Sequence, residues 1–325
     1  MQYHPTKLGI DISKRTFDVC LLNGSKPKFE KFRNDPEGFK KLESWLKKAR
    51  STELHIGMEA TGNYWKALAR FLIAHGHQVS VINPLKIKRY GDYRLHCNKT
   101  DKTDALMIAN YCLQEGENLL LWQDVDEETR HLRDLIQYRG SILTMLGQIK
   151  NRIESIVEDE SVLLCQLEDK AHWEQRLELV NQEVEAAVKE SEAMKKKNAL
   201  LQTIPGIGSV MASYFLAFIP DVSAFKTSRQ VVAYFGLDPS IQESGTSVKK
   251  QSRISKKGNA TFRGKLYLPA IVAVRFNPVI KNLSERMTAS GHLKKEIYVA
   301  AMRKLVILMY GVLKSGKPFD PNYAN

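Results

Sequence analysis

The sequence is poor in cysteine, in long apolar runs and, over its last 125 residues, in acidic side chains. Its four cysteines, Cys20, Cys97, Cys112 and Cys165, form no Cys-x-x-Cys pair. Disulfide-stapled secreted domains and zinc ribbons need closely spaced cysteines, so the spacing indicates neither class. We expect the thiols to be reduced and structural.

No apolar run approaches the length of a membrane span. Runs such as residues 270–274 and 305–308 contain only a few residues, whereas a helix that crosses a bilayer needs roughly 18 to 20. Residues 1–7 are polar and contain Pro5, so they lack the basic region and apolar core of a secretory signal. With 43% hydrophobic residues, the chain is expected to be a folded cytoplasmic protein with no membrane partner.

Positive charge is concentrated in the last part of the chain. Residues 1–200 contain 31 Lys and Arg against 30 Asp and Glu, whereas residues 201–325 contain 18 against 6. Neutralising phosphates releases condensed counterions, so this asymmetry favours a nucleic-acid-binding C-terminal part. The alternative is a solvated surface that happens to be basic.

Apolar periodicity in the first 115 residues predicts an α/β domain. The expected strands are 7–12, 16–22, 28–32, 53–58 and 78–82, and the expected helices are 36–49, 64–74 and one from about 100 onward. Asn83-Pro84 is interpreted as the stop of the last strand. The order β-β-β-α-β-α-β-α predicts a mixed sheet flanked by helices.

Four carboxylates occupy positions that could converge on this sheet. Asp11 interrupts an apolar strand, Glu59 ends another, and Asp101 and Asp104 lie three apart at a helix start. Carboxylates buried together repel one another, and a hard cation such as Mg²⁺ removes that cost. Taken singly, the helical pair could merely complement the helix dipole, and Glu59 could cap the turn at Gly62. Taken together, the four predict a metal site for phosphoryl transfer.

Residues 127–197 predict two long helices with narrow apolar stripes and charged flanks. The first stripe consists of Leu132, Leu135, Ile136, Ile142, Leu146, Ile149, Ile153 and Ile156. The second, Leu177, Val180, Val184, Ala187 and Val188, follows an expected break near residues 158–169. Such a hairpin or coiled-coil seam needs another helix to cover it, which favours a homodimer or homotetramer. The alternative is a hairpin that packs only on itself or its own core.

The basic C-terminal part contains two candidate nucleic-acid contacts. Residues 200–219 resemble a helix-hairpin-helix, whose turn at Gly206 and Gly208 could face a phosphate or could simply allow close packing. The second candidate is a run of cations after Ser244, consisting of Lys249, Lys250, Arg253, Lys256, Lys257, Arg263 and Lys265. The interleaved Phe262 and Tyr267 could stack on bases, although aromatic residues more often fill the core.

Ser244 stands beside Gly245 just before these cations. A serine next to glycine is usually a turn residue. A serine that attacks phosphate needs nearby positive charge and a base or metal to take its proton. The cations supply the first requirement. No histidine lies nearby in the sequence, so the carboxylate cluster is the candidate for the second.

Several stretches together resemble the DEDD transposases of insertion sequences, and the similarity extends over almost the whole chain. The stretches are GIDISK at 9–14, EATGNY at 59–64, VINP at 81–84, NKTDKTDA at 98–105, IPGIG at 204–208, FGLDP at 235–239, ESG at 243–245, SKKG at 255–258 and LKSG at 313–316. One departure from the family pattern is His96-Cys97, where a more basic lead-in is expected.

The resemblance implies a fold, a chemistry and partners. It implies an RNase H-like (RuvC-like) domain at 1–125, a helical hairpin at 126–198 and a mostly helical basic domain at 199–325. Asp11, Glu59, Asp101 and Asp104 match the family's metal-binding acids, for Mg²⁺ or Mn²⁺, and Ser244 matches its catalytic serine. The expected partners are donor DNA, target DNA and a structured bridge RNA, with the protein on the nucleoid when active.

Two other interpretations remain open. A RuvC-like nuclease would hydrolyse DNA junctions with water and use Ser244 only structurally. A non-enzymatic helix-hairpin-helix protein with a decayed sheet domain would bind nucleic acid without cutting it. Covalent attachment of protein to DNA separates the transposase from the nuclease, and metal-dependent cleavage separates both from the binding protein.

Overall fold

The structure, a computed structural model, describes residues 7–23, 26–49, 51, 54–60, 62–94, 100–155, 159–240, 243–244, 248–249 and 253–323. The chain divides into two units, residues 1–124 and 125–325. Each unit has its own hydrophobic core. No helix in the described part of the chain is long and apolar enough to cross a membrane.

The first unit is built on a five-stranded sheet in the order β3-β2-β1-β4-β5. Its strands are β1 (Lys7–Ile12), β2 (Thr16–Leu22), β3 (Lys28–Arg33), β4 (His55–Glu59) and β5 (Gln78–Ile82). Strand β2 is antiparallel to β1 and β3, whereas β1, β4 and β5 run parallel. The mixed sheet expected from the apolar periodicity is therefore confirmed.

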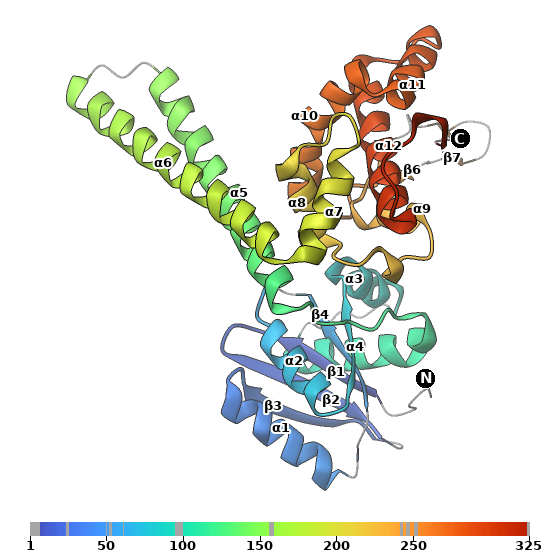
Figure 1. Cartoon of the computed structure of the whole chain (residues 1–325). Helices are drawn as coiled ribbons and strands as arrows, with labels where there is room; N and C mark the ends of the chain where they lie inside the picture. The colour runs from blue at the N-terminus through green and yellow to red at the C-terminus, as the bar shows by residue number, and fades with distance from the viewer. Residues whose placement is uncertain are drawn as a thin grey trace. The chain divides into compact units, whose positions relative to one another are not determined.

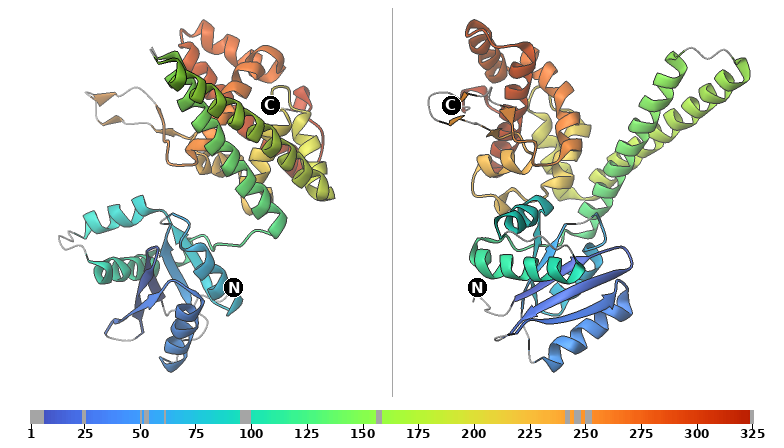
Figure 2. Two further views of the ribbon diagram at one scale, coloured as in Figure 1. Left: turned by 90° about the vertical axis from the view of Figure 1, so that its left-hand side faces the viewer. Right: turned by 180° about the vertical axis from the view of Figure 1, so that it is seen from behind.

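Helices cover both faces of this sheet (Figures 1 and 2). They are α1 (Pro36–Lys48), α2 (Lys66–Ala74), α3 (Pro84–Tyr93), α4 (Asp101–Glu115) and the 3-10 turn η1 (Gly116–Asn118). The apolar side chains Leu8, Ile10 and Ile12 of β1 join the core beneath α1 and α2. The alternate positions of β1, including Gly9 and Asp11, therefore face α4, because successive side chains of a strand point to opposite faces.

Helix α3 was not expected, because Asn83-Pro84 was interpreted only as a strand stop. In the structure the Asn83 side chain accepts a hydrogen bond of 2.9 Å from the Leu85 N–H, and Pro84 occupies the first helical position. Proline is well suited to that position because its fixed φ is helical and its missing N–H is not needed there. The pair therefore ends β5 and begins α3.

Two long helices, α5 (Glu127–Glu154) and α6 (Glu160–Glu190), form an antiparallel hairpin that extends from the rest of the second unit (Figures 1 and 2). The predicted stripe residues Leu132, Leu146 and Val184 lie in one core with the C-terminal helices. The expected break at residues 158–169 is wrong over most of its length, since α6 is already helical at Glu160. Val162, Leu164 and Leu167 in the first part of α6 are exposed, so this part of the helix has no buried apolar face.

The remainder of the second unit is mostly helical. It contains α7 (Glu192–Gln202), α8 (Ser209–Phe218), α9 (Ser228–Tyr234), α10 (Ala260–Phe276), α11 (Pro278–Ala289), α12 (Lys294–Ser315) and the 3-10 turns η2 (Val222–Ala224) and η3 (Pro321–Tyr323). Phe215, Phe235 and Phe262 pack together at its centre, with Phe235 stacked on Phe262, and Phe262 is fully buried. Phe262 therefore belongs to the core, whereas Tyr267 is partly buried against the edge of Tyr298.

Short strands interrupt this helical unit between α9 and α10. Strand β6 (Pro239–Ser240) pairs with β9 (Arg253–Ile254), and β7 (Glu243–Ser244) pairs with β8 (Val248–Lys249), both antiparallel. We call these four strands the serine ribbon. Sequence reasoning missed it because its paired segments are two residues long and mostly polar.

Cys20 and Cys112 are buried in the first unit, Cys165 of α6 is exposed, and all three are free. Burial raises the pKa of the thiols of Cys20 and Cys112 to about 12, so both are protonated at neutral pH. The structural expectation therefore holds for these two and is wrong for Cys165. Cys97 lies outside the described residues.

Candidate active site

Two glycines let α4 approach the sheet closely. A Cβ at Gly9 of β1 would lie 2.2 Å from the Ala105 carbonyl oxygen, and a Cβ at Gly57 of β4 would lie 1.9 Å from Cys112 Sγ. Two residues further along these strands, on the same face, stand Asp11 and Glu59. The close packing of α4 thus continues directly into the acidic positions.

A row of charged residues crosses the sheet on the face that α4 covers. Asp11 pairs in register with Asp18 of β2, and Asp18 pairs with Lys31 of β3. Strand β4 runs parallel on the other side of β1, and continuing its register places Glu59 beside Asp11. We call Lys31, Asp18, Asp11 and Glu59 the charged row.

The first turn of α4 supplies the other two predicted acids, Asp101 and Asp104. The cap of this helix is made by threonines. The Thr103 N–H donates to Thr100 Oγ1 at 3.2 Å, and the Thr100 N–H donates to Thr103 Oγ1 at 2.8 Å. Neither aspartate is the capping residue. Both still carry charge where the helix dipole favours an anion.

The pKa of the Asp11 carboxyl depends on its burial and on the charges of the other three predicted acids. Burial, and then the negative charges of Asp104, Glu59, Asp101 and Asp18, raise the pKa of the Asp11 carboxyl to about 6. Each of these charges disfavours the ionised form of Asp11, as expected of carboxylates that share a site. Asp18 was missed by sequence reasoning, because only the register of two antiparallel strands sets it opposite Asp11.

Lys31 forms two ion pairs at the end of the charged row. Its Nζ lies 3.0 Å from Asp18 Oδ2 and 3.2 Å from Asp101 Oδ2. These contacts raise the pKa of the Lys31 ammonium, first through the hydrogen bonds to Asp18 and Asp101. Lys31 thus joins the sheet to the first turn of α4. It too was absent from the sequence prediction.

The donor set fits a hard divalent cation. Within the described ranges, no three His, Cys, Asp or Glu side chains are close enough together to hold one ion. Burial first, and then the charges of the other predicted ligands, raise the pKa of the Asp11 carboxyl, and a bound cation would offset both effects. Carboxylate oxygens are the ligands that Mg²⁺ and Mn²⁺ prefer.

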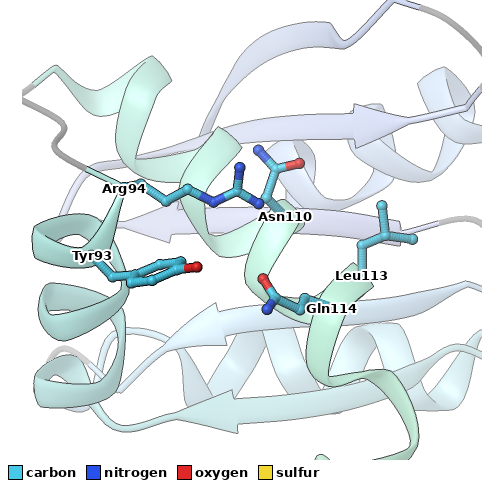
Figure 3. Close-up of a pocket in the computed structure, with 5 residues that line it drawn as sticks. All are labelled: Tyr93, Arg94, Asn110, Leu113 and Gln114. Atoms are coloured by element: carbon cyan, nitrogen blue, oxygen red, sulfur yellow. The ribbon is translucent and has the colours of Figure 1, made fainter.

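A pocket of about 560 Å³ lies elsewhere in the first unit (Figure 3). It is lined by Tyr93 and Arg94 at the end of α3 and by Asn110, Leu113 and Gln114 of α4. Arg94 donates to the Tyr90 hydroxyl at 3.1 Å. None of the predicted acids lines this pocket.

In the second unit, the base of the serine ribbon is held by close backbone packing. Gly236 has a φ of +66°, and a Cβ at Gly258 would lie 2.2 Å from the Tyr234 carbonyl oxygen. The Lys256 N–H donates to the Gly236 carbonyl at 3.1 Å. The two motifs that flank the ribbon in sequence, FGLDP and SKKG, therefore meet through their backbones.

Side chains reinforce the same junction. The Ser255 hydroxyl donates to an Asp238 carboxylate oxygen, and the Ser255 N–H donates to the Asp238 carbonyl at 2.8 Å. Arg263 Nη1 donates to the Phe235 carbonyl at 2.9 Å, and burial lowers the pKa of this guanidinium. Arg263 therefore has a structural role in addition to the nucleic-acid contact predicted for it.

The predicted serine lies in the serine ribbon, and predicted cations lie within the ribbon and just after it in the sequence. Arg253, Lys256 and Lys257 are exposed around the base of the ribbon. Ser244 and Lys249 belong to β7 and β8, and Ser244 pairs with Val248, but their side chains lie outside the described part. Lys250 lies outside the described residues altogether.

Lys265 lines a cavity of about 600 Å³ between α5 and the start of α10. Burial and the nearby charge of Arg139 lower the pKa of its ammonium. The cavity is lined by Ile136, Gln137, Gly140, Ser141, Thr144, Phe218, Asn259, Ala260, Thr261, Gly264 and Lys265. An anion bound in this cavity would offset the repulsion between the Lys265 ammonium and the Arg139 guanidinium.

The predicted helix-hairpin-helix turn lies between α7 and α8. Gly206 has a φ of +101°, and a Cβ there would lie 2.8 Å from Ala273 Cβ of α10. Packing against α10 therefore explains this glycine. Gly208 precedes α8 as its N-cap, and a Cβ at this position would meet no atom within 4 Å, so space remains there for a ligand.

Two family models match most of the chain. A family model of DEDD transposases matches residues 8–160, and a model of the transposase IS116/IS110/IS902 family matches residues 198–285. Both are models of transposases. The chain belongs to the IS110/IS116 family of transposases.

Named relatives cover most of the sequence. The pilin gene-inverting protein of Moraxella bovis is 33% identical over 321 residues, which cover 97% of this chain and 98% of that protein. The transposase for insertion sequence element IS1111A of Coxiella burnetii is 25% identical over 319 residues, which cover 86% of this chain and 80% of that protein. Among solved structures, Thermus thermophilus RuvC in complex with a Holliday junction substrate aligns with 37% of this chain and all of its own, at a TM-score of 0.30 and 12% identity.

Proposed function

We propose that this chain is an RNA-guided DNA recombinase of an insertion sequence, which cuts and rejoins strands through a phosphoserine intermediate at Ser244. The observation that supports the proposal is that the charges of Asp104, Glu59 and Asp101 all act on the half-buried Asp11 carboxyl, in a member of a transposase family. The relative in Moraxella bovis is named for inverting a pilin gene. Inverting a gene requires that cut strands be rejoined.

The carboxylates of the sheet unit have one role in this proposal. Asp11, Glu59, Asp101 and Asp104 would hold Mg²⁺ or Mn²⁺. The bound cation would stabilise charge on a phosphate and favour deprotonation of the attacking hydroxyl. Burial of Asp11 under α4 would keep the donor oxygens oriented and limit access of bulk water. We assign this unit an RNase H-like role on the strength of its strand order and acids.

Ser244 has the other role. Its Oγ would form a bond to phosphorus as its proton leaves, and the ester bond from phosphorus to one deoxyribose oxygen would break as that oxygen gains a proton. Attack by the hydroxyl of another strand would reverse these bonds and free the serine. The phosphoester would thereby conserve the bond energy needed for rejoining, and the site could be completed between protomers.

The basic part of the second unit would hold the nucleic acids. Arg253, Lys256 and Lys257 are exposed in and just after β9 of the serine ribbon, where they could contact phosphates of DNA or of a bridge RNA. Lys249, Lys250, Lys265 and the turn at Gly206 and Gly208 complete the proposed contacts. Sequencing the RNA that copurifies with the expressed chain tests the guide directly.

The decisive experiment asks whether protein becomes covalently attached to DNA. A nicked substrate incubated with the wild-type chain should yield an adduct on a denaturing gel, and peptide mapping should place it at Ser244. Ser244→Ala should lose the adduct and recombination while keeping nucleic-acid affinity, which comes mainly from the surrounding cations. An adduct at another residue would refute the serine mechanism. Metal-dependent cleavage without any adduct would favour the hydrolytic nuclease.

A further inference from the structure

Lys31 is the one member of the charged row that carries positive charge, and it contacts two acids of different character. The Asp18 side chain is 10% exposed and lies within the sheet, whereas the Asp101 side chain is 66% exposed at the start of α4. Both oxygens lie close to Lys31 Nζ, at 3.0 Å and 3.2 Å. A single ammonium therefore neutralises part of an acidic cluster that spans a strand and a helix.

The two ion pairs differ in how easily they can be exchanged. Asp18 is shielded from water, so loss of its cation would leave a buried charge without compensation. Asp101 is largely solvated, so its pair with Lys31 is worth little and can be given up. The side chain of Lys31 is itself 51% exposed and is long enough to remain on Asp18 while it leaves Asp101.

We propose that Lys31 is a built-in counter-cation that occupies Asp101 until a divalent metal displaces it, while Asp18 tethers the released ammonium to the charged row. The inference rests on the proposed metal site. In this proposal Lys31 controls when Asp101 is available to the metal, and Asp18 holds the Lys31 ammonium nearby after its release. Neither residue is one of the four predicted acids. Lys31 then lowers the affinity for metal and stabilises the metal-free protein.

If Lys31 has this role, the Lys31→Met substitution should raise the affinity for metal and lower the stability of the metal-free protein. Without the competing ammonium, the full-length chain should bind Mn²⁺ on the order of 3- to 10-fold more tightly, since like charges a few ångströms apart repel even when partly solvated. In EDTA the same variant should unfold at a lower temperature, because the carboxylates lose their resident cation. A residue that merely stabilised the fold would change the second quantity and not raise the first.

Mn²⁺ titration followed by the electron paramagnetic resonance signal of the free ion measures the affinity, and circular dichroism measures unfolding. Lys31→Arg keeps the charge and should behave as wild type. Lys28→Met, an exposed lysine on the same strand, should change neither quantity. Lys31→Gln replaces the methionine variant if that variant does not fold, with the same expectation.

The outcomes separate the two proposals. Affinity that is unchanged or lower in Lys31→Met, beside normal Mn²⁺ binding by the wild type, overturns the role of Lys31 and leaves the metal site standing. Wild type and Asp11→Asn that bind Mn²⁺ equally weakly overturn the metal site and the role of Lys31 together. Tighter binding with lower metal-free stability, seen only when the charge at position 31 is removed, supports both.

Discussion

Asp11 and Asp18 stand directly opposite each other on adjacent antiparallel strands. Like charges at such a cross-strand position destabilise a sheet. Burial first, and then the charges of Asp104, Glu59, Asp101 and Asp18, make the ionised Asp11 carboxylate costly in the metal-free protein. A divalent ion bound at this position would offset that cost. The first prediction tests this cost.

Asp11→Asn should abolish recombination and yet stabilise the metal-free protein at pH 7.5, raising its unfolding temperature by roughly 2–4 °C. The pKa of Asp11 is raised to about 6, above its unfolded value, so the ionised carboxylate destabilises the fold above pH 6. This cost is relieved as the pH falls toward 4 and Asp11 is protonated. Thermal unfolding in EDTA checks the sign.

Most of the advantage of Asp11→Asn should be lost at pH 4.5, where the carboxyl of the folded wild type is also neutral, and the rest should go as the pH falls below the unfolded-state pKa of about 3.9. Asp169→Asn, which changes an exposed acid of α6, should show no such dependence on pH. Addition of Mg²⁺ should raise the unfolding temperature of the wild type and leave Asp11→Asn unchanged. An Asp11→Asn protein less stable than wild type at pH 7.5 would show that the carboxylate supports the fold rather than burdening it.

Gly258→Ala should disturb the serine ribbon. The added methyl group would lie 2.2 Å from the Tyr234 carbonyl oxygen and 2.4 Å from the Gly236 nitrogen, and backbone atoms cannot move aside as a flexible side chain can. We expect a loss of about 1–3 kcal/mol in the free energy of unfolding, together with loss of the covalent adduct. Chemical denaturation and the gel assay measure the two effects.

Gly264→Ala is the matched control for this change. Gly264 is a helical glycine of α10 with no atom within 4 Å of the added Cβ. Alanine there should stabilise the protein by up to about 1 kcal/mol. Equal adduct formation by Gly258→Ala and wild type would show that the geometry at the base of the ribbon does not govern the serine.

Leu164→Asp combined with Leu167→Asp should dissociate the proposed oligomer without unfolding the chain. Both leucines lie on α6 and are 56% and 42% exposed, so an aspartate at either position does not enter the core of its own chain. By contrast, Leu146 is buried in the second unit, and a charge there would damage the hairpin itself. Light scattering and circular dichroism distinguish the two effects.

Leu120→Asp, at a leucine that is 87% exposed in the first unit, serves as the control for this double variant and should leave the assembly unchanged. A folded Leu164→Asp, Leu167→Asp protein with the wild-type mass in solution would exclude this stretch of α6 from the interface.

Neutralising Arg253, Lys256 and Lys257 together should weaken nucleic-acid binding broadly across sequences. Each phosphate contact that is lost should reduce the slope of log affinity against log salt by about 0.9 for duplex DNA. Fluorescence anisotropy over a range of salt concentrations measures the slope. Neutralising Lys150 and Lys189 of the hairpin, which pair with Glu174 and Glu185, should leave the slope unchanged. A slope that falls in the hairpin variant and not in the ribbon variant would assign nucleic-acid binding to the hairpin.

The elements of the sheet unit could be predicted well because their signal is local. Strands 7–12, 16–22 and 78–82 are observed with the predicted bounds, since each carries a dense run of apolar residues. Helix α3 was not predicted, and the reason is also local, because Asn83-Pro84 both ends a strand and begins a helix. The serine ribbon was not predicted because strands of two residues are too short to show an apolar periodicity.

The candidate site was predictable only in part. The four acids could be nominated because each stands at an unusual place in its own element. Asp18 and Lys31 could not, because their meeting depends on the register of three strands and on the position of α4.

The closeness of α4 to Gly9 and Gly57 has a consequence for how copies of a mobile element are judged. A copy with alanine at position 9 would retain every carboxylate, the serine and the basic run, and would look intact by its reactive residues. Its extra methyl group would nevertheless push the helix off the sheet, and with it the first turn that carries Asp101 and Asp104. An insertion sequence can thus fall silent through one added carbon atom, at a position that carries no functional group.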